Sequence, residues 1–282
     1  MSTFAEVSIE RVRAYWNGRP CNVRHSPEPV GTRKYFDQVE ERKYFVEPHI
    51  PLFADFPRWR GKRVLEIGCG LGTDTTNFAR NGATVTAVDL SDESLALARR
   101  RAEIFGLDDR ITFVCANAEE LPTVVEPEPY DLVYSFGVIH HTPHPERVLD
   151  HVHDYLRPGG TLKLMVYHRR SWKVLAIIAR YGRGRFWHAR SLVAEHSEAQ
   201  IGSPVTYTYS RAEFRRLLEE HGFRVDEMRV EHIFAWRIRD YVRYRYVRSW
   251  PLRALPEPLF RRLERVLGWH LCATAIKEGS DE

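Results

Sequence analysis

Three glycines and one aspartate form the most informative spacing in this sequence. The stretch VLEIGCGLGTDT (64–75) begins as an apolar run and then places Gly68, Gly70 and Gly72 at alternate positions. Such glycines let the backbone turn tightly and approach a ligand, and the helix that follows offers free N–H groups. Asp89 lies 21 positions after Gly68, close to the spacing at which a carboxylate binds ribose hydroxyls. The pattern fits a dinucleotide or an adenosyl cofactor.

The residues around the glycines separate these two cofactors. The third glycine comes one residue too early for the dinucleotide fingerprint G-x-G-x-x-G. Glu66 precedes the first glycine by two residues. Its carboxylate would repel a pyrophosphate but can pair with an ammonium group, directly or through water. S-adenosylmethionine carries an ammonium and a sulfonium and no phosphate, so the electrostatics favour it.

Histidines gather where a proton-transfer group would be needed. His140, His141 and His144 follow a predicted strand, and histidine titrates near neutral pH, as a general base requires. His141 is the preferred catalytic base and His140 the second candidate, although this pair can also simply pack around a cofactor. His151 and His153 cannot share a helix face, and no cysteine or carboxylate completes a ligand spacing. We therefore expect no metal site.

Alternating apolar runs and helical segments must position these residues. Strands are predicted at 63–67, 84–88, 110–115, 130–135 and 161–167. Helices are predicted at 73–82, at 91–106, and from 145 to the LRPGG terminator at 156–160. Strands separated by helices imply right-handed crossovers and a parallel sheet covered on both faces. In such a doubly wound α/β sheet ligands bind at the carboxyl ends of the strands, where the residues above fall.

Five motifs, taken in order, resemble those of class I S-adenosylmethionine-dependent methyltransferases. They are VLEIGCGLGTDT, TAVDLS, FVCANAEELP, YDLVYSFGVIHHTPHPE and LRPGGTL, and the match covers about 63–166. The resemblance implies a Rossmann-like, seven-stranded sheet that is mostly parallel, with its last two strands at 224–230 and 270–276 and the last one antiparallel. It also implies an enzyme of the small-molecule type that converts S-adenosylmethionine to S-adenosylhomocysteine (SAH).

The resemblance also implies roles for matching positions. The methionine part of the cofactor would face Glu66 and the loop of Gly68, Cys69, Gly70 and Gly72, the ribose would meet Asp89, and Asn117, Ala118 and Glu119 would flank the adenine. Ser135 and Phe136 would lie near the sulfonium, and Asp74 and Leu90 complete the expected cofactor-binding set. The family often has aspartate where this chain has Asn117, and an amide can still bind the adenine amino group through its carbonyl.

The N-terminal segment, 1–60, is expected to form a helical lid over the cofactor. Tyr44, Glu47 and His49 stand just ahead of the first strand. Tyr44 is the third catalytic candidate, and the resemblance assigns no individual roles to Glu47 and His49.

The remaining segments divide into core and cap. The core at 61–167 continues at 210–231 and ends with the last strand and tail at 269–282, and insertions at 168–209 and 232–268 are expected to form a helical cap. These insertions are the parts expected to select the substrate.

One stretch of the second insertion has a helical pattern. Arg237, Tyr241, Tyr244 and Arg248 fall at i, i+4, i+7 and i+11, which predicts one face of an amphipathic helix. Arginines that face a pocket suit an acceptor with a carboxylate or phosphate. Interleaved arginines and aromatics can instead stack on single-stranded RNA, so an RNA methyltransferase is an alternative.

Composition narrows the class further. The 282 residues carry a net charge of +4 with 43% hydrophobic content, and no separate basic module indicates nucleic-acid binding. The four scattered cysteines form no CxxC pair, and no apolar run approaches the length of a membrane span. We expect a cytoplasmic monomer or homodimer that acts on a small molecule. A non-catalytic regulator that binds S-adenosylmethionine is a second possibility, and a nicotinamide oxidoreductase is a third.

Overall fold

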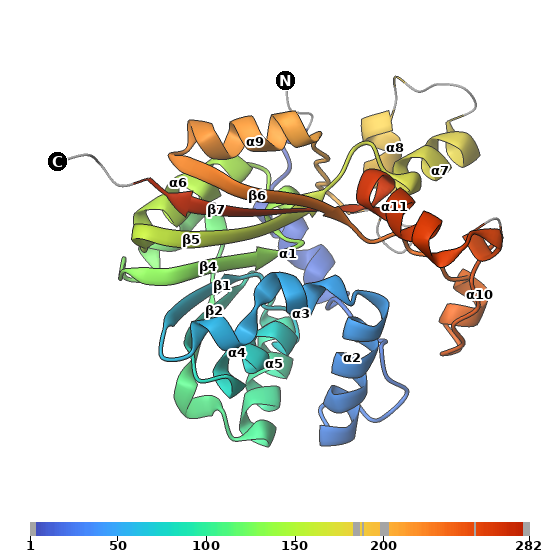
Figure 1. Ribbon diagram of the computed structural model, residues 1–282. Coiled ribbons are helices and arrows are strands. Elements are labelled where there is room, and N and C mark those ends of the chain that lie inside the picture. Colours follow the sequence, from blue (N-terminus) through green and yellow to red (C-terminus); the bar gives the residue numbers. More distant parts are fainter. Residues whose placement is uncertain (1–3, 183–186, 188, 198–202, 251, 279–282) are drawn as a thin grey trace.

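A seven-stranded sheet in the order β3-β2-β1-β4-β5-β7-β6 forms the centre of the computed structural model (Figure 1). The strands are β1 (Arg63–Ile67), β2 (Thr84–Asp89), β3 (Ile111–Cys115), β4 (Tyr130–Phe136), β5 (Leu156–Tyr167), β6 (Phe223–Glu231) and β7 (His270–Lys277). β7 runs antiparallel to both of its neighbours, and the other pairs are parallel. The predicted fold, a doubly wound sheet with an antiparallel last strand, is confirmed.

The structure describes residues 4–182, 187, 189–197, 203–250 and 252–278. The other positions of the expected lid, cap and tail lie outside the described residues.

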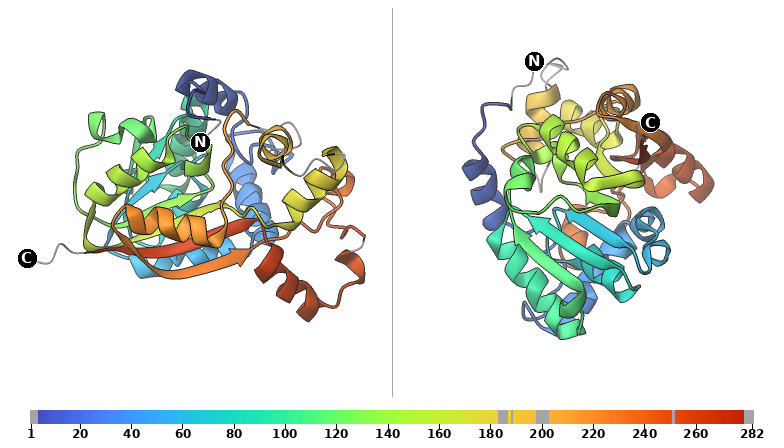
Figure 2. Two further views of the ribbon diagram at one scale, coloured as in Figure 1. Left: turned by 90° about the horizontal axis from the view of Figure 1, so that it is seen from above. Right: turned by 90° about the vertical axis from the view of Figure 1, so that its left-hand side faces the viewer.

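Helices cover both faces of the sheet. α4 (Thr73–Arg80) and α5 (Asp92–Phe105) pack over one face, and α6 (Pro145–Tyr155) and α9 (Arg211–Glu220) pack over the other. Side chains alternate along a strand. Val64 of β1 therefore packs in the core under α4 and α5, whereas Leu65 and Ile67 pack in the core under α6 and α9. Figure 2 shows α9 lying along β6 and β7.

Side-chain and glycine caps set the boundaries of two of these helices. The Ser91 side chain accepts the N–H of Ser94, and Gly106 ends the same helix in the left-handed region, with φ of 65°. Ser210 and Glu213 form the reciprocal capping box of α9.

The predicted start of the fifth strand is corrected. β5 begins at Leu156, directly after α6, rather than at 161, because Leu156 already pairs with Tyr130 before a register shift in the ladder.

Most of the remaining helices lie beyond the carboxyl ends of the parallel strands, whereas residues 54–59 pack on the sheet face that α4 and α5 cover. The lid contributes α1 (Ile9–Asn17), α2 (Arg33–Val46), α3 (His49–Ala54) and the 3₁₀ turn η1 (Phe56–Trp59), and the cap contributes α7 (Trp172–Tyr181), α8 (Ala189–His196), α10 (Ile238–Tyr241), η6 (Leu252–Ala254) and α11 (Glu257–Leu267). Short 3₁₀ turns lie between core elements at η2 (Asp108–Arg110), η3 (Ala118–Thr123) and η4 (Ile139–His141). In Figure 1, α2, α7, α8, α10 and α11 lie on the right-hand side, beyond the sheet. Within the described ranges, none of these helices combines the length and apolarity that crossing a membrane requires.

The predicted amphipathic helix in the second insertion is wrong. α10 ends at Tyr241 after four residues, and Tyr244 adopts a positive φ of 59°, which a continuous helix does not allow. The aromatic rings turn instead toward the lid, where the Arg42 guanidinium lies 4.1 Å from the Tyr241 ring centre and 4.3 Å from that of Tyr244. These cation–π contacts, together with the hydrogen bond from Arg42 to the Tyr241 carbonyl, outweigh the local helical pattern.

A buried arginine ties the lid to the core. Arg101 of α5 has no exposed side-chain surface, and it donates to Thr76 of α4, to the Phe36 carbonyl of α2 and to the Glu40 carboxylate of α2. One side chain therefore holds three helices together, and Glu40 balances its charge away from water.

We expect Glu40→Gln to lower the free energy of unfolding by about 3 kcal/mol, because it leaves the buried Arg101 charge without its counterion. Glu103→Gln is the matched control, since the Glu103–Arg100 pair is 57% exposed on both sides and its loss should cost less than about 1 kcal/mol. Urea denaturation measures both values. Equal effects of the two substitutions would contradict the structural role of Arg101.

Candidate functional site

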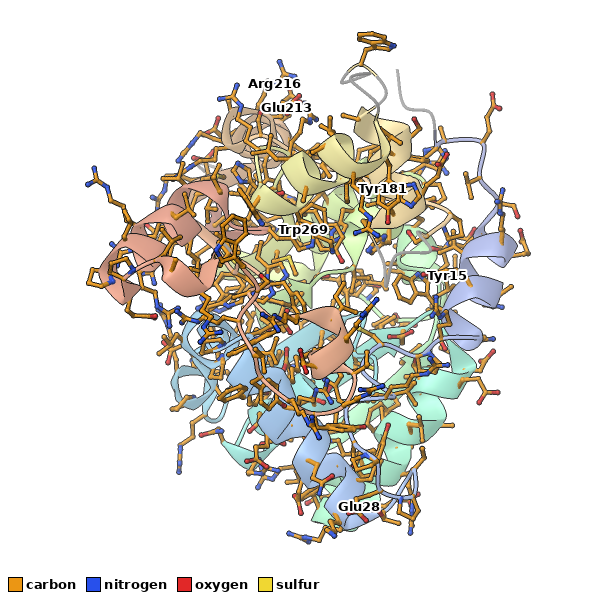
Figure 3. The ribbon with its side chains drawn as sticks, turned by 90° about the vertical axis from the view of Figure 1, so that its right-hand side faces the viewer. Tyr15, Glu28, Tyr181, Glu213, Arg216 and Trp269 are labelled. Atoms are coloured by element: carbon orange, nitrogen blue, oxygen red, sulfur yellow. The ribbon has the colours of Figure 1, made fainter. Side chains whose placement is uncertain are left out.

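A cavity of about 1150 Å³ lies over the carboxyl ends of the central strands. Its floor comes from the glycine loop and the ends of β2, β4 and β5, and its walls come from α1, α2, α7 and the 232–250 segment. Figure 3 looks onto this end of the molecule and shows Trp269 and Tyr181, both of which line the cavity, near α7. The lid and cap thus meet the core around one shared space.

The three glycines of the loop all have positive φ but serve different purposes. A Cβ atom on Gly68 would lie 2.1 Å from a Val138 methyl carbon, and one on Gly72 would lie 3.1 Å from Ala98 of α5. Among the described residues, a Cβ atom on Gly70 would meet nothing within 4 Å, and Gly70 lines the cavity. Gly68 and Gly72 are therefore required by protein packing, whereas Gly70 leaves room for a ligand.

Asp89, the last residue of β2, binds the backbone of the glycine loop. Its two carboxylate oxygens accept the N–H groups of Gly70 and Ser91, each at 2.8 Å. Burial raises the pKa of Asp89, and these N–H groups act in the opposite direction. The carboxylate lines the cavity beside Asn117 and Ala118.

A polar cluster lies at the α2 side of the loop. The Asp74 carboxylate accepts the Lys43 ammonium at 2.6 Å and the Tyr44 and Tyr134 hydroxyls at 2.9 Å each. Burial opposes the charged form of Lys43, but the Asp74 carboxylate outweighs it and raises the pKa of Lys43. The lid helix is thus held to α4 by a buried ion pair.

Glu66 belongs to the same cluster. It is buried and accepts the Thr75 hydroxyl at 2.5 Å. Burial and the nearby Asp74 charge raise the pKa of Glu66 to about 8, so at neutral pH it is mostly a neutral acid. Glu66 does not line the cavity, and its expected contact with the cofactor ammonium stays a prediction.

The cavity brings together many but not all of the predicted site residues. Those that line it are Gly68, Cys69, Gly70, Asp89, Leu90, Asn117, Ala118, Phe136 and His141. Those that do not are Glu66, Gly72, Asp74, Glu119, Ser135, His140 and Tyr44. Three of the residues outside the cavity make hydrogen bonds within the protein. Glu119 accepts the His144 N–H, Ser135 donates to the Ile67 carbonyl, and Tyr44 donates to Asp74.

Lys43 also lines the cavity, although it is not among the site residues predicted from the sequence. The signal was present, because Lys43 falls four positions after Val39 and seven after Phe36, on the buried face of α2. A lysine on the apolar face of a helix requires a buried partner, which here is Asp74.

The two catalytic histidine candidates have different surroundings. His141 lines the cavity, and its Nδ1 lies 2.6 Å from the Val205 carbonyl oxygen. A carbonyl accepts only, so Nδ1 carries the proton and Nε2 is the basic nitrogen of the neutral ring. His140 is completely buried behind it, and burial together with His141 holds the pKa of His140 well below its usual range. Of the pair, His141 is the one placed to meet a ligand.

Comparison with known proteins identifies the family. Residues 39–228 match the family described as a methyltransferase domain, which is more than half of the chain. The chain belongs to this family. It is a class I methyltransferase domain, and the methyl donor of the class is S-adenosylmethionine.

Individual relatives match a smaller part of this methyltransferase. The ubiquinone biosynthesis O-methyltransferase of Klebsiella pneumoniae is 32% identical over 123 residues, which cover 43% of this chain and 50% of that protein. The protein of the same name from Idiomarina loihiensis is 35% identical over 156 residues, covering 54% of this chain and 60% of that one. The aligned part therefore spans about half the length of the curated relatives it matches.

A solved structure shows the same fold over nearly the whole length. The magnesium protoporphyrin IX methyltransferase from Synechocystis, crystallised with bound SAH, superposes with a TM-score of 0.60 over 96% of this chain and 100% of that one, at 16% identity. At this identity the likeness concerns the fold.

The residues present fit S-adenosylmethionine. Gly70 leaves space where a side chain would project into the cavity, and the Asp89 carboxylate stands at its edge. We infer that Asp89 would hold the ribose hydroxyls and that Lys43 would face the cofactor carboxylate, since both line the cavity. When bound, the cofactor supplies an electrophilic methyl group.

We expect Gly70→Ala to keep the fold but weaken SAH binding by at least about tenfold, or 1.4 kcal/mol, because the new methyl group enters the ligand space. Gly68→Ala should instead destabilise the fold by about 3 kcal/mol, since its Cβ collides with Val138. Isothermal titration with SAH and urea denaturation measure the two effects. SAH binding that survives in Gly70→Ala would show that the ligand does not approach this residue.

We expect stability to fall as pH rises between the ordinary Glu66 pKa of 4.5 and its folded value of about 8. In this window the folded chain holds a proton that the unfolded chain has released, so raising the pH favours unfolding. Glu66→Gln keeps an acceptor for Thr75 and should remove this part of the pH dependence. Urea denaturation of both proteins at about pH 5 and about pH 8 measures it. A difference between the two proteins that does not change with pH would contradict the raised pKa.

Proposed function

We propose that this methyltransferase transfers the methyl group of S-adenosylmethionine to a small aromatic acceptor that carries an acidic group. The observation that carries the proposal is the cavity of about 1150 Å³ shared by the glycine loop, the lid and the cap. Binding sites for one small ligand usually fall between about 300 and 1000 Å³, so this space suits the cofactor together with a second small molecule.

The walls opposite the glycine loop support an aromatic acceptor. Trp172 and Trp236 of the cap, Trp269 directly before β7, and Trp16 of α1 all line the cavity. Flat indole rings stack on planar ligands and bury a large apolar area.

Cationic side chains on the same walls support an acidic group on the acceptor. Arg19 of the lid and Lys173 and Arg180 of α7 line the cavity. The Lys173 ammonium lies 4.4 Å from the centre of the Trp269 ring, which places a positive charge beside the aromatic wall. A carboxylate or phosphate on the acceptor would be attracted to this side of the cavity.

The names of the curated relatives support oxygen as the nucleophilic atom, because they are O-methyltransferases. A hydroxyl must lose its proton as the new bond forms, and we propose that His141 accepts it. Its Nδ1–H is fixed by the Val205 carbonyl, so Nε2 is the nitrogen that can accept the proton.

The cysteines support the cytoplasm as the site of action. All four are free thiols, as expected where glutathione keeps cysteine reduced. We propose a cytoplasmic monomer or homodimer.

We expect labelled methyl groups to pass from S-adenosylmethionine to a phenolic acid such as a dihydroxybenzoate, and at least about tenfold more slowly to the matching phenol without the carboxylate.

His141→Gln should lower turnover by about 100-fold with unchanged SAH affinity. Thin-layer separation of the labelled products, with total RNA as a parallel acceptor, measures these outcomes. Label in RNA alone would overturn the proposal, and unchanged turnover in His141→Gln would remove this residue as the base.

A further inference from the structure

Four titratable side chains from three separate parts of the chain gather beside the cavity, and three of them, Glu47, His232 and His270, line it. Glu47 ends the lid helix α2, His49 begins α3, His232 follows β6, and His270 begins β7. The antiparallel pairing of β6 and β7 ends with Glu231 opposite His270, and His232, which follows β6 with a positive φ, stacks its ring on that of His270. This group is distinct from the glycine loop and from His141.

The ligand atoms of three of these residues lie close together. One atom each from Glu47, His232 and His270 falls within a group no more than 4.8 Å across. His270 Nε2 is 3.5 Å from a Glu47 carboxylate oxygen, and the two imidazole rings are stacked with centroids 4.7 Å apart. Small shifts of these side chains would bring all three atoms to about 2.1 Å from one metal ion.

His49 orients His270 from behind. Its Nε2 lies 2.9 Å from His270 Nδ1, so Nδ1 of His270 is engaged and Nε2 is the nitrogen that points toward Glu47. A hydrogen bond to the far nitrogen of a histidine ligand is the usual way in which proteins fix the ring of such a ligand. His49 thus supplies the outer support of a ligand set.

His232 adopts a backbone conformation that needs an explanation. It has a positive φ of 67°, which is uncommon for a residue with a side chain and which, when it persists, is found most often at functional sites. The residue is 8% exposed and lines the cavity. In the described part of the chain, its ring makes aromatic contacts with His49 and His270 but no hydrogen bond. A buried imidazole without a hydrogen-bond partner and facing a cavity is available to a ligand.

We propose that Glu47, His232 and His270 form a binding site for one divalent first-row transition-metal ion at the acceptor side of the cavity. Two imidazoles and one carboxylate suit ions such as Zn²⁺ or Fe²⁺ and disfavour Mg²⁺ or Ca²⁺, which prefer oxygen ligands. Three protein ligands leave further coordination positions open. Because all three residues line the cavity, those positions are open to a bound molecule.

The expectation that no metal is bound came from histidines close together in the sequence, and it did not consider a set assembled from positions 47, 232 and 270. The site borders the end of β4, since the His270 ring lies 5.4 Å from that of Phe136. If the proposed function holds, an acceptor oxygen would occupy an open position on the ion. Metal binding itself does not depend on that function.

The test is metal binding by the untagged, full-length chain. After treatment with a chelator, the protein is dialysed against Zn²⁺ or Co²⁺, and bound metal is counted by mass spectrometry while Co²⁺ is followed by its visible absorption. We expect about one ion per chain and the absorption of a nitrogen- and oxygen-ligated site. Mg²⁺ in excess should not displace the ion.

Two variants and one control locate the site. Glu47→Gln keeps the shape of the side chain, and His232→Asn suits the positive φ because asparagine tolerates it. Each should weaken Co²⁺ binding by more than about tenfold. His141→Gln, which changes another buried histidine of the same cavity, should leave Co²⁺ binding unchanged. Thermal melting and SAH titration of each variant verify folding.

Absence of a stoichiometric ion, or equal Co²⁺ affinity in the wild-type chain and the Glu47→Gln/His232→Asn double variant, would overturn the proposal. Full metal binding in a chain that transfers no methyl group to any acceptor would support the site and count against the proposed function alone.

Discussion

The ion pair between Lys43 and Asp74 is the contact on which the arrangement of the site depends. Lys43 comes from the lid helix α2, and Asp74 stands in the first turn of α4, directly after the glycine loop. A buried charge pair is costly to separate, because either partner alone would lose its compensation away from water. The hydroxyls of Tyr44 and Tyr134 share the same carboxylate. Through this contact the lid is fixed beside the loop, and the end of α2 brings Glu47 to the cavity.

The same helix also makes the contact with the cap. Arg42, one residue before Lys43, lies over the rings of Tyr241 and Tyr244. Neighbouring residues of one helix thus bind the core and the cap, respectively. Because α2 makes both contacts at once, it holds the core and the cap on either side of the cavity, and the ion pair of Arg101 with Glu40 holds the same helix against the core.

Much of the fold and part of the site could be predicted from the sequence, because both rest on local patterns. The strand positions, the caps at Ser91 and Ser210, and the loop glycines each follow from residues within one turn or one strand. The helix expected across 237–248 does not form, because a residue distant in the sequence determines the conformation of this segment. Its periodicity was real, but Arg42, some 200 positions away, offers the aromatic rings a better partner than a continued helix does.

The sequence by itself determined the methyl donor and the sheet, since the motifs that specify them are contiguous and their order dictates the topology. Only the tertiary structure decided which of the loop glycines leaves room for a ligand, because that depends on Val138 lying over Gly68 while no described residue lies over Gly70. It also decided the grouping of Glu47, His232 and His270. The ladder of β6 and β7 brings the two chain segments together, the positive φ of His232 accompanies the stacking of its ring on His270, and the docking of α2 brings the carboxylate to them. No spacing in the sequence encodes a contact between residues so far apart.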